Sequence, residues 1–155
     1  MSRPRGAAAW LLACQAVGWL AVAAFTLRAF SFKVAMRLAS HPLPRPSRSE
    51  PSAAVLAADI RWAVLAAARR VPWRTVCIHR GLAAQIMLRR RGVPSRLYYG
   101  ARSNGLHEDG SQGLAAHVWV RLGDQGVVGG EGADRFAVLA VFPPQLEVED
   151  QDRAA

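Results

Sequence analysis

Two residues in this chain have the types and the setting that nucleophilic catalysis needs, Cys77 and His117. Cys77 stands at the predicted start of a helix, where unpaired backbone amides and the helix dipole favour an anion. Arg74, His79 and Arg80 add positive charge close by in the sequence. Because the thiolate is the reactive form of cysteine, this is a suitable place for a nucleophile.

His117 begins the run His117-Val-Trp-Val120, which is typical of a strand. If that strand packs against the start of the Cys77 helix, the imidazole reaches the thiol. The pair would then form a couple for acyl transfer, with histidine as general base and acid. Spacing alone leaves a second interpretation open, in which Cys77 is an inert packing residue and His117 is hydrogen-bonded elsewhere.

The segments that must position this pair differ in the spacing of their apolar residues, which is helical first and strand-like later in the chain. Ala-rich helical spacing covers about residues 52–70, and a second helix is predicted from Thr75 or Val76 to Arg91. Thr75 is the expected N-cap, and Gly92 with Pro94 ends the helix. Strand patterns follow at 96–101, 114–122 and from 127, with a polar loop at 102–113, a turn at 123–126 and a strand or short helix at 136–142. Helices first and strands after predict an α+β domain with a small antiparallel sheet.

The N-terminal part is apolar, and residues 6–27 carry no charge. A stretch of about 20 such residues is long enough to cross a bilayer. The alternative is one long helix over about residues 7–40 that packs on the rest of the chain or on a partner. We expect an N-terminal helical region at 1–40, a proline-rich linker at 41–51, a catalytic domain at 52–143 and a flexible acidic tail at 144–155. A cytoplasmic location is expected, with membrane association through residues 6–27 left open.

Composition narrows the function classes. The chain has 20 Lys and Arg against 11 Asp and Glu, a net charge of +9. The arginines do not gather with aromatic residues on a recognition element, so no nucleic-acid partner is expected. The run Arg89-Arg90-Arg91 is interpreted as a solvated helix end, with binding of an acidic leader as the second interpretation. Two distant cysteines form no disulfide framework, and no ligand cluster predicts a metal or cofactor.

Residues 61–123 resemble the C-terminal, transglutaminase-like half of the lasso-peptide biosynthesis B protein, a leader peptidase. The matching features are Val71-Pro72, Cys77 with Arg80 and Leu82-Ala83, Leu88 to Pro94, Leu97, Gly100, and Ala116 to Val120 with Gly123. The resemblance implies a papain-like cysteine peptidase that removes the leader from a ribosomally made precursor peptide. It carries over Cys77 as nucleophile and His117 as general base and acid, with Trp119 supporting the packing of the histidine.

The same resemblance implies partners. In that family a small PqqD-like domain recognises the leader, and here it is expected as a separate protein. A macrolactam cyclase of the asparagine-synthetase kind is the expected next enzyme.

The family's catalytic triad has an acidic third member, which has no clear counterpart in this chain. Family members place an Asp on the strand after the histidine, where this chain has Val127-Val-Gly-Gly-Glu131. Glycine occupies the expected acidic position, and Glu131 lies one position further. Glu131 is the candidate if the strand ends in a bulge, and Asp124 in the turn is a poorer one. Two other functions stay open: an acyl transferase or amidase of the wider transglutaminase-like group, and a noncatalytic scaffold that holds peptide or cyclase.

Overall fold

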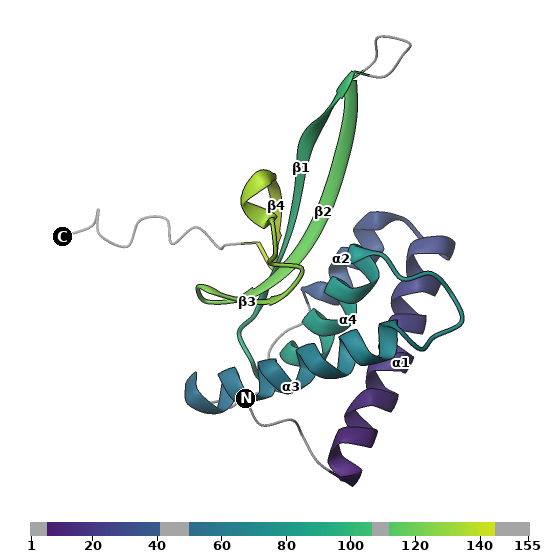
Figure 1. Cartoon of the computed structure of the whole chain (residues 1–155), viewed down its shortest axis with the longest axis vertical. Helices are drawn as coiled ribbons and strands as arrows, with labels where there is room; N and C mark the ends of the chain where they lie inside the picture. Colours follow the sequence, from purple (N-terminus) through teal and green to yellow (C-terminus); the bar gives the residue numbers. More distant parts are fainter. Residues whose placement is uncertain (1–5, 41–49, 107–111, 145–155) are drawn as a thin grey trace, which may run out of the picture.

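The computed structural model describes residues 6–40, 50–106 and 112–144 and has four helices packed beside one sheet (Figure 1). Nearly all of the predicted proline-rich linker and acidic tail lies outside these residues. The elements are α1 (Ala7–Ala29), α2 (Phe32–Ala39), α3 (Glu50–Ala68), α4 (Cys77–Arg89), β1 (Arg96–Leu106), β2 (Gln112–Leu122), β3 (Gln125–Val128), the 3-10 turn η1 (Ala133–Arg135) and β4 (Ala137–Phe142). The predicted α+β arrangement with an antiparallel sheet is confirmed.

The sheet has the order β3-β2-β1-β4, and every neighbouring pair is antiparallel. The β1–β2 hairpin projects well beyond the helices (Figure 1). The predicted loop from residue 102 is wrong at its start, because β1 continues to Leu106. Arg102 and Ser103 pair with Ala115 and Leu114 of β2. This pairing extends the ladder through residues of low strand propensity.

The N-terminal helical region is broken, so the prediction of one helix over residues 7–40 is wrong. α1 ends at Ala29, and Ser31 in extended conformation precedes α2. The break turns α2 toward the sheet, where Phe32 contacts the rings of Tyr99 and Phe142 at centroid distances of 5.2 and 6.4 Å. Residues of all four helices and of β1, β2 and β3 share one hydrophobic core.

Gln85 connects α4 to three other elements. Its side chain is fully buried, and the two N–H groups of Nε2 are shared among the carbonyls of Ala39, Ser95 and Phe142, which lie at 3.3, 3.0 and 3.1 Å. These carbonyls lie at the end of α2, before β1 and at the end of β4. Because a buried carbonyl without a partner is costly, one amide here supports three chain segments.

The arginine run at the end of α4 is only in part the solvated helix end interpreted from sequence: Arg90 is exposed and Arg91 donates to the Met87 carbonyl of the last turn, but Arg89 differs. Arg89 is buried and donates to the Ser95 carbonyl, and burial lowers the pKa of its guanidinium. Arg90 lies over the Trp19 ring, 5.4 Å from its centroid, and Arg91 donates to the Gln15 side chain. Arg90 and Arg91 therefore fasten α4 to α1. The predicted glycine stop is confirmed, since Gly92 has φ 77°.

The start of α4 is held by a histidine. Val76 is the N-cap, and its amide donates to His79 Nδ1 at 3.1 Å. The predicted N-cap role of Thr75 is wrong, because its hydroxyl donates instead to the Ala68 carbonyl at 3.4 Å. Burial, and then the neighbouring Arg80 charge, lower the pKa of His79 below its ordinary value. A neutral ring with an unprotonated Nδ1 is the form that accepts this bond.

α4 approaches β2 closely at Gly81. A Cβ atom on Gly81 would lie 2.7 Å from Val118 Cγ1, well inside ordinary contact. Val118 is buried and β-branched, so its side chain has little freedom to move away. Glycine therefore sets the distance between the Cys77 helix and the His117 strand.

We predict that Gly81→Ala destabilises the protein. Overpacking against Val118 costs about 1–3 kcal/mol, against a gain in helix propensity of about 1 kcal/mol. In a Val118→Ala background the space exists, and Gly81→Ala becomes neutral or stabilising. Urea unfolding of the four proteins measures this double-mutant cycle. An equal loss in both backgrounds would show that the Val118 contact is not the cause.

We also predict that His79 makes stability depend on pH. Because the folded protein holds the pKa of His79 below the ordinary 6.5, the unfolded chain binds a proton first as the pH falls. The stabilisation is complete above pH 6.5 and is lost as the pH falls below that value through the lower folded pKa. In His79→Gln, the amide oxygen accepts the same bond without titrating. Thermal unfolding across this range should show a smaller acid loss in the variant; parallel curves would contradict the assignment.

Candidate active site

Cys77 is the first residue of α4, which confirms its predicted place at a helix N-terminus. Its side chain is half-buried and packs against the shared core. The first turn of α4 contains no acidic residue, and His79 and Arg80 follow within it. The backbone amides at a helix start have no intrahelical partner, so they can donate hydrogen bonds to a negatively charged group. Cys77 therefore has the setting of a nucleophile. The face of α4 that carries it offers no general base, so a base must come from another element.

His117 lies on β2, where it is in register with Gly100 of β1. Its Nε2 atom is 2.7 Å from the Gly129 carbonyl oxygen. The ring stacks on Trp119 at 5.8 Å between centroids and contacts Phe136 at 5.0 Å. The predicted packing role of Trp119 is confirmed. The ring is held on three sides by a carbonyl and two aromatic side chains.

The strand separates His117 from the helices. Side chains alternate between the two faces of a strand, and Val118 faces Gly81 of α4. His117 and Trp119 therefore face the opposite side. There Tyr98 stacks on Trp119 at 5.6 Å, and Arg102 lies over Phe136 at 5.2 Å. We call this surface, formed by Tyr98, Arg102, His117, Trp119 and Phe136, the outer aromatic face.

The two predicted catalytic side chains are consequently not hydrogen-bonded to each other. Within residues 6–40, 50–106 and 112–144, no hydrogen bond joins the Cys77 thiol to the His117 ring. α4 packs on the inner side of β2, and the His117 ring packs on the outer aromatic face. On the other edge of β2, β3 pairs only as far as Val120, and the chain then leaves the sheet at Gly129.

The place expected for an acidic residue is taken by the Gly129 carbonyl. When Nε2 carries the proton and donates to this oxygen, Nδ1 is left as the basic nitrogen. Gly129 has φ 72°, and a Cβ there would lie 2.7 Å from the Val118 carbonyl oxygen. Both facts favour glycine at 129. A side chain is therefore excluded at residue 129, whereas the expected acidic position is the next residue, Gly130, where a Cβ would meet only Gly126 Cα at 3.4 Å.

Glu131 and Asp124, the two acidic candidates, have other partners. The Glu131 carboxylate accepts from Arg61 Nη2 at 2.9 Å, and it is 84% exposed. Arg61 also donates to the Val127 carbonyl at 2.8 Å, so it ties α3 to β3 and the segment after it. Asp124 lies 3.5 Å from Arg121. The expected contact between either carboxylate and His117 is not present in the described residues.

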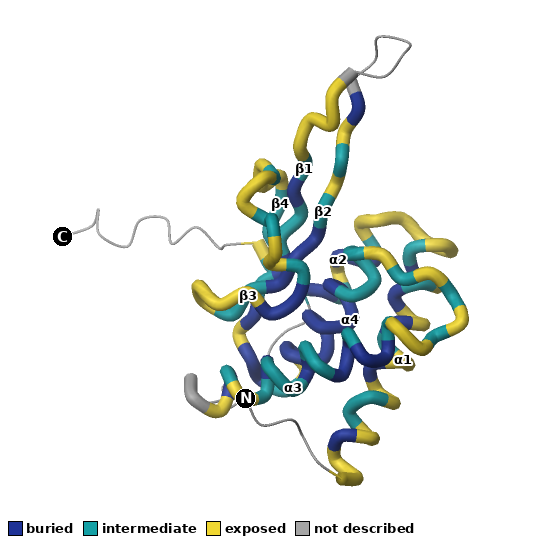
Figure 2. The backbone as a smooth tube through the Cα atoms, viewed as in Figure 1, coloured by how far each residue is buried: buried dark blue, intermediate teal, exposed yellow. Residues whose placement is uncertain are grey.

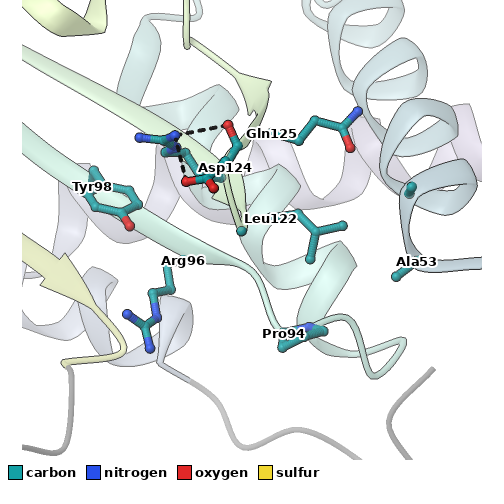
Figure 3. A pocket seen from close by; sticks show the side chains of 10 residues that line it. Ala53, Pro94, Arg96, Tyr98, Leu122, Asp124 and Gln125 are labelled. Carbon is teal, nitrogen blue, oxygen red and sulfur yellow. Dashed lines mark hydrogen bonds and ion pairs between the residues drawn. The ribbon is translucent and has the colours of Figure 1, made fainter. Parts of the chain in front are cut away.

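Two hollows adjoin the outer aromatic face. The first, about 400 Å³, is lined in part by Trp119, Phe136 and Val138. The second, about 660 Å³, is lined in part by Arg96 and Tyr98 (Figure 3). Arg121 and Asp124 line both, and the dashed lines in Figure 3 mark the contacts between them. Both hollows are lined by aromatic and charged side chains together.

Most of this surface is not predicted from the sequence. Tyr98, Gly100 and Arg102 alternate along a strand, but that pattern does not indicate a site. Gly100 belongs to the motif that resembles the family. A Cβ on it would lie 2.9 Å from the Trp119 ring and 2.8 Å from the Ala137 carbonyl, so glycine makes room for the indole. In the described part of the chain, no group of three His, Cys, Asp or Glu side chains is arranged to hold a metal ion.

Comparison with protein families gives one result that covers most of this arrangement. The model of the transglutaminase-like superfamily matches residues 19–141, from the middle of α1 to the end of β4. Comparison with curated proteins and with solved structures gave no match. The superfamily includes cysteine peptidases and acyl transferases. The extent of the match, together with Cys77 at a helix start and His117 on the second strand, shows that the chain belongs to the transglutaminase-like superfamily.

Proposed function

We propose that this protein is a cysteine peptidase that removes the leader from a ribosomally synthesised precursor peptide during lasso-peptide maturation. Cys77 is the nucleophile, and His117 is the general base and acid. The observation that carries the proposal is the 2.7 Å contact between His117 Nε2 and the Gly129 carbonyl. It orients the ring and leaves Nδ1 free for the thiol proton. Family membership and the place of Cys77 at the start of α4 support it.

The reaction follows from these roles. The Cys77 sulfur attacks the scissile carbonyl while His117 Nδ1 takes the thiol proton. The tetrahedral oxyanion receives hydrogen bonds from amides at the start of α4, with the Cys77 amide as first donor. His117 then gives its proton to the leaving amine, and a thioester remains on Cys77. Water attacks the thioester with His117 as base, which releases the new carboxylate and restores the thiol.

Proton transfer requires Cys77 and His117 to come within hydrogen-bond reach, at about 3–3.5 Å for a sulfur partner. The proposal places this meeting at the edge of β2 beside Gly129, where β3 has ended. Catalytic hydrogen bonds often tighten only when substrate is bound. A precursor lying across the hollows of the outer aromatic face would contact Phe136 and Trp119, the two rings that hold the histidine.

The partners belong to the same proposal. A separate PqqD-like protein would bring the leader, and a macrolactam cyclase of the asparagine-synthetase kind would use the released core peptide. Both are expected to act in the cytoplasm. With an amine in place of water as acceptor, the same Cys–His chemistry makes an acyl transferase.

A noncatalytic scaffold is the second candidate, and one observation favours it. Val118 faces α4 and His117 faces away from it, as expected if the histidine serves only the outer aromatic face. In that function the chain would bind the precursor or the cyclase, and Cys77 would be a packing residue. Thiol reactivity separates the two candidates.

We predict that an alkylating agent labels Cys77 faster than Cys14. Cys14 is exposed and Cys77 is half-buried, so access alone would give the opposite order. His117→Ala should lower the Cys77 rate by about 10-fold or more and leave the Cys14 rate unchanged, because only the activated thiol depends on the base. Peptide mass spectrometry at neutral pH measures both rates in one sample. Slow labelling that ignores His117 would support the scaffold.

We predict that the purified chain, incubated with its precursor and the leader-binding protein, produces a leader-sized mass loss that is absent with Cys77→Ala. His117→Ala should lower the rate by about 10²–10⁴-fold, the usual contribution of acid–base catalysis. Glu131→Gln is the matched control and should retain activity, since its carboxylate contacts Arg61. If Glu131→Gln is as inactive as His117→Ala, the acid rather than the Gly129 carbonyl holds the triad position.

A further inference from the structure

α1, the longest helix in the described part of the chain, leaves a set of large apolar side chains exposed. The side of α1 that faces α3 and α4 buries Ala9, Ala16, Leu20, Ala23 and Thr26. On the other side Trp10, Leu11 and Phe25 are 75%, 65% and 64% exposed, and Val17 and Val22 are also exposed. A surface helix of a soluble protein turns most of its large apolar residues toward the core. α1 does so with Leu20, but it also leaves large apolar side chains on its outer side, which indicates an apolar surrounding there.

The exposed side chains form one continuous stripe. At about 100° per residue, Trp10, Val17 and Phe25 fall on one half of the helix, and the buried alanines fall on the other half. From Trp10 to Phe25 the stripe is about 22 Å long. Only 22% of the most apolar 18-residue stretch of α1 is buried (Figure 2). We call this stripe, formed by Trp10, Leu11, Val17, Val22 and Phe25, the outer α1 stripe.

The basic residues that follow the stripe indicate which kind of apolar surface it would contact. No Asp or Glu occurs in residues 6–40. Arg28 lies in the last turn of α1, and Lys33 and Arg37 follow on α2; all three are exposed. An apolar stripe with cations at its end and no anions complements a bilayer of anionic lipids, where each basic residue near the surface adds to binding.

A groove beside the stripe also has a lining that fits a lipid. It has a volume of about 390 Å³ and lies between α1 and α3, lined by residues that include Trp10, Val17, Trp62 and Arg70. Nearly all of its lining is apolar, and Arg70 is its charged member. An acyl chain below an anionic headgroup has this chemistry.

We propose that α1 docks the protein on an anionic bilayer by lying in the interface, with the outer α1 stripe in the upper acyl region. α1 is long and apolar enough to span, but it packs along one side on α3 and α4. A spanning α1 would draw Asp59 and Arg61 of α3 toward hydrocarbon, which is costly. In the interfacial arrangement, α1 inserts one side and the remaining domain stays in water. This inference does not depend on the peptidase proposal.

The test uses the full chain and vesicles of phosphatidylcholine with and without phosphatidylglycerol. Flotation should recover the protein with the anionic vesicles and not with the neutral ones. Trp10→Ser with Phe25→Ser should abolish recovery, and Arg28→Gln with Lys33→Gln and Arg37→Gln should weaken partitioning by roughly 10-fold or more. Leu114→Ser with Leu139→Ser is the matched control, because both leucines are exposed on the sheet. This control should float like the parent protein.

Other outcomes would overturn the proposal. Equal recovery with both vesicle types would show that binding does not depend on anionic lipid. No recovery with either type would show that the protein does not bind a bilayer. Retention after an alkaline carbonate wash would show a spanning helix. A dimer in light scattering that Trp10→Ser with Phe25→Ser converts to monomer, without vesicle binding, would assign the stripe to a second copy of the chain. Circular dichroism of each variant confirms that it is folded.

Discussion

The close contact between α4 and β2 at Gly81 is the constraint on which the rest of the structure depends. Without a side chain at this position, the helix backbone comes near enough for Val118 to fill the space above it. One turn further, Gln85 then reaches carbonyls in three other segments. Interiors packed at this density transmit any change in spacing to their neighbours. The distance fixed at Gly81 is therefore also the distance between the Cys77 helix and the sheet.

The same contact decides what His117 can do. Once Val118 faces the helix, strand alternation puts His117 on the outer aromatic face. Gly100 and Gly129 then allow the indole and a carbonyl to approach the ring from either side. A carbonyl can select the tautomer as an acid does. It bears no net charge, so it stabilises an imidazolium less than a carboxylate would. Any acid–base role of His117 is accordingly weaker than in a complete triad.

α1 is attached in a different way from the other helices. Alanines give close approach but bury little apolar area, so they contribute little free energy to the attachment. Side chains from the end of α4 add to it, with Arg90 over Trp19 and Arg91 bonded to Gln15. Leu20 adds one large apolar side chain to the core, whereas Trp10, Leu11 and Phe25 stay exposed. α4, which carries Cys77, therefore contacts α1 on one side and β2 on another.

The sequence by itself determined the elements and the chemical candidates. The spacing of apolar residues and the positions of glycine and proline predicted the α+β order, the start of a helix at Cys77 and its end at Gly92. These features depend only on residues that are neighbours in the sequence. It did not determine which face of β2 carries His117, since a strand pattern fixes alternation but not which set faces inward. Nor could it give the partner of Glu131, because Arg61 is distant in sequence. Only the packing of α3 and α4 on the sheet decided those contacts.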